Sequence, residues 1–359
     1  MSEAKPRWKN RPEGSNWGDF GPDDQLGRLN LITAEQVLSG AREIREGMSF
    51  CLSMPLDFPG ESLLNQRRHP PIKKPTEKDG LPYLNFPVAN LDPGAIDILS
   101  DDSVLLYLQY STHWDSFAHV GARFDADDDG VDEAVYYNGY RAHEHIQGPV
   151  EYRTDGAETG LWKPYVCGCN QSHAAALGIE NAAVKGIQGR GLLIDLVAHF
   201  GYEYRTIGYE DLMRVIAVDE IEIAEGDIVL IRTGFTELIL EMDRHPNLDA
   251  LNARCSALDG RDDRLLQWLT DTRIAALVAD NYAVERFPAL PAKRVGPAPA
   301  LPLHHHCLFK LGMPLGELWY LRDLAEWLRS RGRSHFMLTA PPLRLPGAIG
   351  SPVTPIATV

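Results

Sequence analysis

The middle of the chain alternates between short apolar runs and segments of helical periodicity, and this alternation restricts the fold more than any other feature. The apolar runs 191–196, 227–232 and 275–280 have the length of buried strands. Between them, residues 209–217 and 264–269 place apolar side chains at the three- and four-residue spacing of a helix. Strands that alternate with helices predict a mixed α/β fold with some parallel pairing.

The flanking regions carry their own signals. Thr33 with Gln36 three residues later fits a capping box and predicts a helix that runs to about Arg45. A strand is expected to begin at residue 103, and residues 316–331 have the apolar spacing of an amphipathic helix. The first 32 residues, rich in Trp, Gly and Asp, are expected to form an irregular N-terminal arm. Because no stretch resembles a linker, we expect a single domain over residues 1–359.

Composition excludes several classes of function. Apolar residues make up 44% of the 359 residues, and no stretch approaches the roughly 20 consecutive apolar residues that span a bilayer. Fifty acidic against 35 basic residues leave a formal net charge of −15, which repels phosphate backbones and anionic membranes. We therefore expect a cytoplasmic protein whose partner is a small-molecule substrate, with no nucleic-acid or membrane partner.

The five cysteines are odd in number and scattered, which is not the pattern of a disulfide framework. Cys167 and Cys169 form a C-x-C pair, but without a second pair this is weak evidence for a soft-metal site. Reduced, partly buried thiols are the expectation.

One polar stretch points to chemistry. Side chains alternate between the two faces of an extended chain, so the odd-numbered residues Gln109, Ser111, His113, Asp115 and His119 would share one face if the strand continued through them. Imidazole nitrogen with carboxylate oxygen is a normal ligand set for Zn²⁺ or Mn²⁺. Two such ligands alone do not make a site, and a polar edge strand would explain them equally well.

A second cluster supplies more ligands. Three consecutive histidines, residues 304–306, precede an apolar segment that ends at Glu317. A hydrolytic metal site needs three or more protein ligands and an open position for water. His113 and Asp115 with either His305 or Glu317 would meet that count. The chain lacks both the dinucleotide-binding G-x-G-x-x-G and the G-x-S-x-G nucleophile elbow, so dinucleotide oxidoreductases and serine hydrolases are not favoured.

These residues carry a resemblance to a known family. Thr112-His113-Trp114-Asp115 with His119 resembles the H-x-G-T-H-x-D-x-P-x-H signature of the metal-dependent cyclase/kynurenine formamidase superfamily, which also includes isatin hydrolase. Residues 16–30 and the ending 350–352 resemble the longer members of that superfamily, so the similarity runs nearly end to end. The implied fold is a swivelling β/β/α arrangement around a β-barrel-like core, usually assembled as a homo-oligomer such as a dimer or tetramer.

The resemblance also implies roles for single residues. His113 and Asp115 would bind a divalent metal ion, Zn²⁺ or Mn²⁺, and His119 would be the catalytic acid/base. His305 and Glu317, twelve residues apart, resemble the second metal-binding element of the family and would be further ligands.

Three positions depart from the family signature. Its first histidine is Gln109 here, its glycine is Ser111 and its proline is Phe117. An amide oxygen is a far weaker ligand for Zn²⁺ than an imidazole is. The departure at Gln109 therefore predicts a loosely bound Zn²⁺, a harder ion such as Mn²⁺, or no metal.

The function implied by the resemblance is hydrolysis of a small cyclic amide, lactone or aryl formamide, as in arylformamidase, by metal-activated water with His119 as acid/base. A cyclase or an isomerase/lyase on the same scaffold, and a metal-free homologue that binds a small molecule, stay open as alternatives. Trp17, Tyr137 and Asn138 are candidate substrate-binding residues, and packing in the core would explain them equally well.

Overall fold

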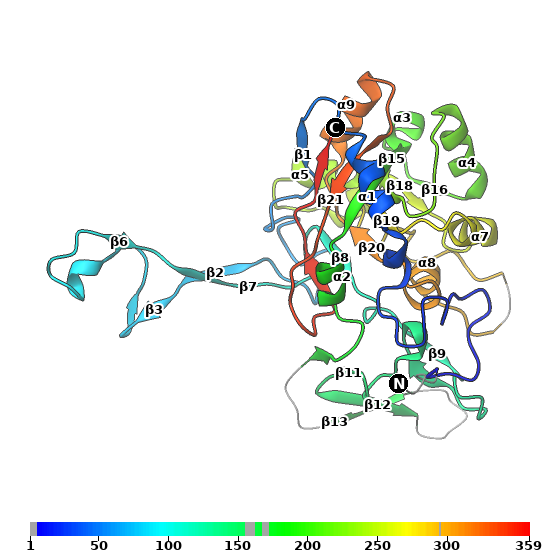
Figure 1. Cartoon of the computed structure of the whole chain (residues 1–359), viewed down its shortest axis with the longest axis horizontal. Coiled ribbons are helices and arrows are strands. Elements are labelled where there is room, and N and C mark those ends of the chain that lie inside the picture. Colours follow the sequence, from blue (N-terminus) through cyan, green and yellow to red (C-terminus); the bar gives the residue numbers. More distant parts are fainter. Residues whose placement is uncertain (1–5, 155–161, 167–171, 294–295) are drawn as a thin grey trace.

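The computed structural model describes residues 6–154, 162–166, 172–293 and 296–359. Its mixed α/β fold is built on one curled nine-stranded sheet with the strand order β1–β23–β21–β15–β17–β19–β20–β8–β22 (Figure 1). The strands of this sheet are β1 (Ser49–Cys51), β8 (His113–Asp115), β15 (Gln188–Asp195), β17 (Ile228–Arg232), β19 (Ala276–Ala279), β20 (Leu315–Glu317), β21 (His335–Thr339), β22 (Gly350–Pro352) and β23 (Ile356–Thr358).

The centre of the sheet is parallel and lies between two hydrophobic cores. Strands β15, β17, β19 and β20 pair in parallel, and every residue of β17 and β19 is buried. Leu192 and Ile194 of β15 belong to one core and Leu193 to the other, as the alternation of side chains along a strand requires. Burial on both faces explains why these strands are apolar throughout, and it confirms the mixed α/β prediction with parallel pairing.

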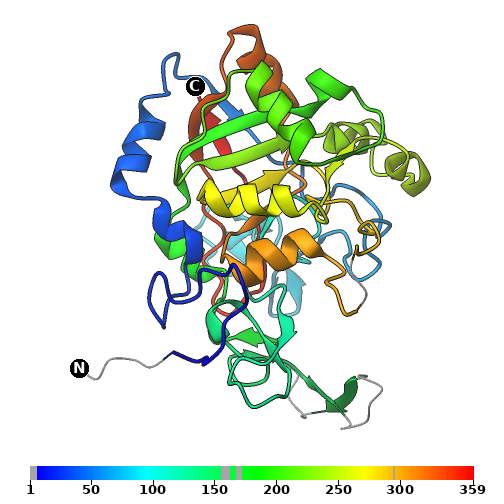
Figure 2. The ribbon, with the colours of Figure 1, turned by 90° about the vertical axis from the view of Figure 1, so that its right-hand side faces the viewer.

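Helices cover both faces of the sheet. Leucines of α4 and α7 lie in one core and those of α9 in the other; Figure 2 shows α1 (blue) and α7 (yellow) on different sides of the central strands. The helices are α1 (Ala34–Ala41), α2 (Glu180–Lys185), α3 (Leu196–Phe200), α4 (Tyr209–Val218), α5 (Phe235–Glu241), α6 (Leu248–Asn252), α7 (Asp263–Asp271), α8 (Pro302–His304) and α9 (Arg322–Ser330), with the 3₁₀ helices η1 (Gly27–Leu31), η2 (Val88–Asn90) and η3 (Tyr137–Gly139) and the π-helix η4 (His305–Lys310).

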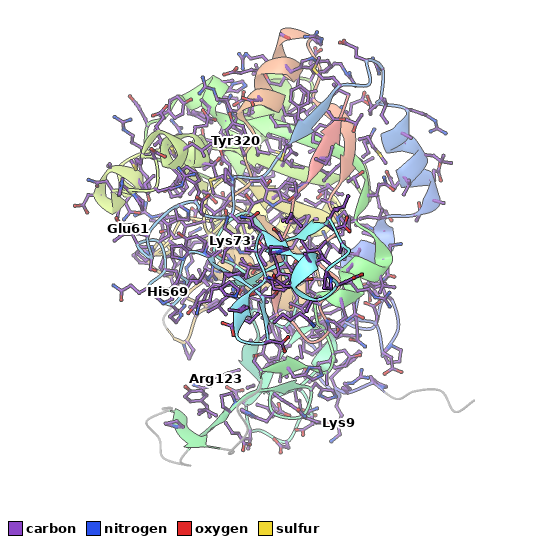
Figure 3. The ribbon with its side chains drawn as sticks, turned by 90° about the vertical axis from the view of Figure 1, so that its left-hand side faces the viewer. Lys9, Glu61, His69, Lys73, Arg123 and Tyr320 are labelled. Carbon is purple, nitrogen blue, oxygen red and sulfur yellow. The ribbon has the colours of Figure 1, made fainter. Side chains whose placement is uncertain are left out.

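Smaller two-stranded ribbons complete the fold. The ribbon of β2 and β7 projects far from the sheet and carries two shorter ribbons (Figure 1), and we call residues 70–107 the projecting arm. Figure 3 views the molecule from the side of this arm, with Lys73 on it. The ribbons pair β2 (Ile72–Pro75) with β7 (Asp102–Leu105), β3 (Glu77–Lys78) with β4 (Leu81–Pro82), β5 (Phe86–Pro87) with β6 (Ile98–Leu99), β9 (Ala122–Phe124) with β10 (Glu133–Val135), β11 (Ile146–Gln147) with β14 (His173–Ala174), β12 (Val150–Thr154) with β13 (Trp162–Val166), and β16 (Arg205–Ile207) with β18 (Ser256–Leu258).

Three predicted elements differ from the structure. The strand expected from residue 103 ends at Leu105, and the chain turns before β8 begins at His113. The helix expected over residues 316–331 begins only at Arg322, because the segment before it pairs with two strands as β20. The first helix does begin after Thr33, whose Oγ1 accepts a hydrogen bond from the Gln36 backbone N–H, but it ends at Ala41.

The helices and the cysteines can be compared with the expectations from the sequence. Among the described residues, no helix is both long and apolar enough to cross a membrane. Cys167 and Cys169 lie outside the described residues, and the free thiols of the described part belong to Cys51, Cys255 and Cys307.

Candidate functional site

Strand pairing brings three of the predicted ligands together. His113 and Asp115 lie two residues apart on β8 and so share a face of that strand, and Glu317 of β20 lies directly opposite His113. His113 Nε2 is 3.5 Å from Glu317 Oε2 and 3.6 Å from Asp115 Oδ1. All three side chains are buried, and one ligand atom of each lies within 4.8 Å of the others. We call these three residues the ligand cluster.

The hydrogen bonds of the ligand cluster leave ligand atoms free. His113 Nδ1 lies 2.7 Å from the carbonyl oxygen of Ser111 and donates to it, so the lone pair of the neutral ring is on Nε2. Burial lowers the pKa of His113 to about 4, which keeps the ring neutral at pH 7. His113 Nε2 and Asp115 Oδ2 are buried without a hydrogen-bond partner. Because buried polar atoms are normally satisfied, these two atoms and the Glu317 carboxylate fit a divalent cation.

Like charge adds to the case for a cation. Burial raises the pKa of Glu317, and the nearby Asp115 carboxylate raises it further. Two carboxylates in one buried site repel each other; the His304 ring that is hydrogen-bonded to Glu317 offsets part of this repulsion, and a cation held by both carboxylates would offset more.

Gln109 and His119 lie beside the ligand cluster despite the break in the strand. The amide nitrogen of Gln109 lies 3.3 Å from Asp115 Oδ1 and 3.0 Å from His119 Nδ1. Because an amide nitrogen only donates hydrogen bonds, His119 Nδ1 is the acceptor and the proton of the neutral ring is on Nε2. Burial lowers the pKa of His119 below its ordinary value. In this arrangement the amide nitrogen of Gln109 faces the ligand cluster. An amide nitrogen does not bind metal, whereas the sequence predicted that the amide oxygen would be a ligand.

The histidine of the second cluster is His304 and not His305. His304 Nε2 lies 3.1 Å from Glu317 Oε1, and its Nδ1 lies 2.8 Å from Glu285 Oε1. Burial alone would lower the pKa of His304, but hydrogen bonds to both carboxylates outweigh it and raise the pKa to about 10, so the ring is an imidazolium.

The structure does not bring His305 to the ligand cluster, which corrects the prediction from the twelve-residue spacing. Its ring packs against Phe309 at a centroid distance of 4.9 Å and borders a different cavity beside Lys310. Successive helical residues point about 100° apart, so only one of three adjacent histidines can face the sheet.

Glu285 is the site residue that the sequence reasoning missed. It is buried, and its two oxygens accept hydrogen bonds from the backbone N–H groups of Leu303 and His304 as well as from the His304 ring. No local motif marks this glutamate, because its partner lies nineteen residues further along the chain.

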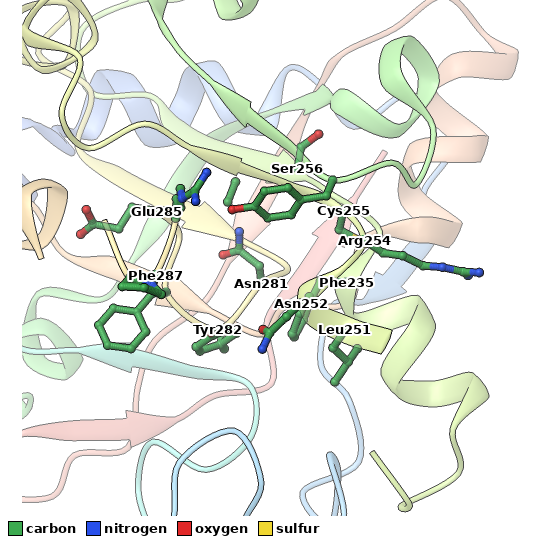
Figure 4. A pocket seen from close by; sticks show the side chains of 15 residues that line it. Phe235, Leu251, Asn252, Arg254, Cys255, Ser256, Asn281, Tyr282, Glu285 and Phe287 are labelled. Carbon is green, nitrogen blue, oxygen red and sulfur yellow. The ribbon is translucent and has the colours of Figure 1, made fainter. Parts of the chain in front are cut away.

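A cavity of about 340 Å³ opens beside these groups. Gln109, His119, His304 and Glu317 line it together with Arg67 and Arg68 and with an apolar wall of Leu64, Tyr282, Phe287, Leu301 and Leu318. A second cavity of about 300 Å³ shares Tyr282, Ala283 and Phe287 with it, and Figure 4 shows the side chains that line this second cavity. The paired Glu285 and His304 line one cavity each, so they form part of the wall between them.

The three candidate substrate-binding residues lie elsewhere. Trp17 is fully buried, donates from Nε1 to the carbonyl oxygen of Phe309 at 2.8 Å and packs edge-on against the Phe309 ring. Asn138 accepts a hydrogen bond from the Gly18 N–H, and the Tyr137 hydroxyl lies 3.5 Å from Asp24. None of the three lines the 340 Å³ cavity. They fasten the N-terminal segment to the rest of the fold, which corrects their predicted role.

A curled α/β sheet whose adjoining strands hold a buried histidine–carboxylate ligand cluster beside a cavity defines a candidate metal-dependent active site. Residues 50–286 match the sequence profile of the family described as "Putative cyclase". A crystal structure described as a novel cyclase is 31% identical to this chain, with a TM-score of 0.71 over 96% of this chain and 97% of that one. The chain therefore belongs to the cyclase family and is an enzyme, and the resemblance and fold expected from the sequence are confirmed.

More distant structures share the fold. Isatin hydrolase A from Labrenzia aggregata is 16% identical, with a TM-score of 0.51 over 90% of this chain and 98% of that chain. An isatin hydrolase bound to the product analogue thioisatinate is 13% identical, with a TM-score of 0.52 over 91% of this chain and 99% of that chain. The search of curated proteins found no match.

Proposed function

We propose that the protein is a metal-dependent hydrolase that breaks the C–N or C–O bond of a small cyclic amide, lactone or aryl formamide. The observation that carries this proposal is the pair of unpartnered buried atoms, His113 Nε2 and Asp115 Oδ2, beside Glu317. The cavity next to them gives a substrate access to the same place. Isatin hydrolases with the same fold support hydrolysis as the reaction class.

His113, Asp115 and Glu317 would hold the ion, Zn²⁺ or Mn²⁺, as one imidazole and two carboxylates. Bound there, such an ion lowers the pKa of a water molecule toward about 7 and polarises a carbonyl group. Gln109 would join as a fourth ligand only with its amide turned so that the oxygen replaces the nitrogen. His304, as an imidazolium hydrogen-bonded to Glu317, keeps one oxygen of that carboxylate occupied and orients the other toward His113.

His119 is the acid/base of the proposed mechanism. With Gln109 donating to Nδ1, the proton of the neutral ring is on Nε2, the position from which it can pass to a leaving nitrogen or oxygen. To take a proton from water, Nε2 must instead be bare, and a half-turn of the Gln109 amide achieves this by placing its oxygen as acceptor for Nδ1–H. The Gln109 amide therefore selects which half of the acid/base cycle His119 can perform.

We also propose that the protein is a cytoplasmic homo-oligomer. The exposed Cys51 thiol supports a reducing compartment. Support for assembly comes from the projecting arm, since two-stranded ribbons are marginally stable alone in water and this one exposes many large apolar side chains. These are Ile72, Leu81, Leu84, Leu91, Ile96, Ile98, Leu99, Val104 and Leu105.

The test combines metal content with product analysis. Protein purified without chelator is assayed for bound Zn²⁺ and Mn²⁺ and for hydrolysis of a panel of lactones, cyclic amides and aryl formamides in ¹⁸O-labelled water. We expect bound metal and label in the product, and loss of both in Asp115→Asn, whereas Asp249→Asn on the exposed face of α6 behaves as wild type. Turnover by metal-free protein that is unchanged in Asp115→Asn would refute the proposal, and turnover without label would indicate a cyclase or isomerase.

A further inference from the structure

The second cavity, of about 300 Å³, is lined by buried polar atoms that have no partner. Asn281 lines this cavity and is only 5% exposed, yet its Oδ1 accepts no hydrogen bond within the part of the chain that the structure describes. The Nε atom of Arg286, on the same cavity, is also buried without a hydrogen-bond partner. Because buried polar atoms are normally satisfied, a free acceptor and a free donor on one cavity indicate a binding site.

The free edge of the Arg286 guanidinium has the shape that binds a carboxylate. Among the described residues, this group donates one hydrogen bond, from Nη1 to Thr206 Oγ1 at 3.0 Å, and forms no ion pair. The edge formed by Nε and Nη2 is therefore open. The same edge of Arg190 donates two hydrogen bonds of 2.8 Å, one to each carboxylate oxygen of Asp227. A carboxylate is thus the group that this edge of Arg286 fits.

The charges around the second cavity favour an anion. Its charged lining residues are Arg254, Glu285 and Arg286. Both oxygens of Glu285 already accept hydrogen bonds, from two backbone N–H groups and from the His304 ring. Figure 4 shows the Arg254 side chain pointing away from Glu285. The neighbouring Asp280 does not line the cavity, and its carboxylate accepts three hydrogen bonds from N–H and O–H groups elsewhere. The charge left to meet a ligand is therefore the positive charge of Arg286.

Asn281 and the apolar lining restrict the ligand further. Asn281 Nδ2 donates to the carbonyl oxygen of Val284 at 3.3 Å, so the amide oxygen is the end that is left for a ligand. That oxygen only accepts hydrogen bonds and repels a carboxylate, so the ligand needs an O–H or N–H donor besides its acid group. Phe235, Leu251 and Phe287 also line the cavity and suit an apolar or aromatic body.

We propose that the second cavity binds a small hydroxy acid with an apolar body. Its carboxylate accepts two parallel hydrogen bonds from Arg286, and its hydroxyl donates to Asn281 Oδ1. A hydroxyl is the better donor here than an ammonium group, which would meet the like charge of Arg286. The second cavity contains no residue of the ligand cluster and shares only Tyr282, Ala283 and Phe287 with the 340 Å³ cavity. This inference therefore does not depend on the proposed function.

Three fluorinated probes of similar size test the inference by binding. ¹⁹F NMR titrations compare 4-fluorophenyllactate, which carries a carboxylate and a hydroxyl, with 4-fluorophenylpropanoate, which lacks the hydroxyl. The third probe is the amide of 4-fluorophenyllactic acid, which lacks the charge. Each titration is run with and without EDTA, because binding of a carboxylate to a metal ion would be lost in EDTA.

The variants separate the two cavities. Arg286→Gln and Asn281→Ala remove the two groups of the proposed site, and Arg286→Lys keeps the charge but not the fork. The control Arg254→Gln removes the other guanidinium of the second cavity, and Arg67→Gln/Arg68→Gln removes both guanidiniums of the neighbouring cavity. Thermal melting verifies that each variant is folded.

We expect the wild type and both controls to bind the lactate about tenfold or more tightly than its amide. This ratio falls to about one in Arg286→Gln and takes an intermediate value in Arg286→Lys. The wild type prefers the lactate to the propanoate by about threefold or more, and Asn281→Ala binds the two equally. Equal binding of the lactate and its amide, or of the lactate and the propanoate, by wild type would overturn the inference. So would an undiminished ratio in the Arg286 variants, or loss of the ratio in Arg67→Gln/Arg68→Gln or in EDTA.

Discussion

Replacing Asp115 by Asn should change stability in opposite directions with and without metal. The asparagine Oδ1 can still accept the hydrogen bond from the Gln109 amide, so the substitution mainly removes a buried negative charge. In chelator, this carboxylate lies beside the like charge of Glu317, and its Oδ2 has no hydrogen-bond partner. An unsatisfied buried group costs about 1–3 kcal/mol, so the metal-free variant should be as stable as the wild type or more stable by up to that amount.

Bound metal should reverse this order of stability, so that the wild type is more stable than Asp115→Asn. A ligand that binds only the folded state at 100 times its Kd stabilises it by about 2.7 kcal/mol. At about 2.1 cal/mol/K per residue, the unfolding entropy of 359 residues is about 0.75 kcal/mol/K, so this gain raises the Tm of the wild type by about 4 °C. The variant, which lacks a ligand, should gain much less.

Scanning calorimetry in chelator and then in a Zn²⁺ or Mn²⁺ titration measures both effects, with Asp249→Asn as the control for loss of an exposed carboxylate. Two results would contradict the reasoning. One is an equal metal-induced rise of Tm in wild type and Asp115→Asn. The other is a metal-free Asp115→Asn that is several kcal/mol less stable than the metal-free wild type, because the carboxylate would then be satisfied without an ion.

Three further predictions concern other parts of the molecule. Gln109→Glu replaces a hydrogen-bond donor to His119 by a negatively charged acceptor, which raises the pKa of His119. The acid limb of the plot of kcat/KM against pH should therefore move upward by about one pH unit, whereas Gln109→Leu should lower kcat without moving that limb. Burial lowers the pKa of His306 to about 3, so between pH 6.5 and 3 the unfolded chain binds a proton that the folded chain excludes. The free energy of unfolding therefore decreases as the pH falls. Urea unfolding should show that the decrease between pH 7 and pH 5 is about 2 kcal/mol smaller in His306→Gln than in the wild type, and equal decreases would contradict a neutral, buried His306. Ile96 is 93% exposed on the projecting arm, so Ile96→Asp should shift an oligomer toward monomer in light scattering without lowering the Tm of the monomer, and an unchanged mass would exclude the arm from the interface.

The sequence predicted the centre of the fold because its physical causes are local. The runs at 191–196, 227–232 and 275–280 are apolar on both faces, and only strands buried on both sides need that pattern. For the segment after residue 315, the local pattern predicted the wrong element. Its apolar spacing agrees with a helix, but pairing of Glu317 with β8 holds the first residues in a strand, and a partner 200 residues away leaves no trace in local periodicity.

The spacing of residues along the sequence did not show in which direction each side chain points. His304 and His305 have almost the same separation from Glu317, and only the turn of the short helix α8 decides which ring faces the ligand cluster. The aromatic and amide side chains of Trp17 and Asn138 suit a binding pocket as well as a core, and their hydrogen bonds to backbone groups distant in sequence decide for the core. Residue type indicated which chemistry to propose for the site, whereas tertiary packing determined which residues lie in it.

The departure from the family signature at Gln109 has a different consequence from the one that ligand strength suggests. Losing an imidazole would weaken a site that depended on it, but His113, Asp115 and Glu317 already supply three ligand atoms without Gln109. The amide instead contacts both the Asp115 carboxylate and His119, the proposed acid/base. An amide can present either a donor or an acceptor, whereas an imidazole bound to metal through one nitrogen can only donate from the other. Glutamine at this position would therefore couple the ligand cluster to the protonation state of the proposed acid/base. In the proposed mechanism, the residue that replaces one ligand of the family signature would therefore control where the proton of His119 lies.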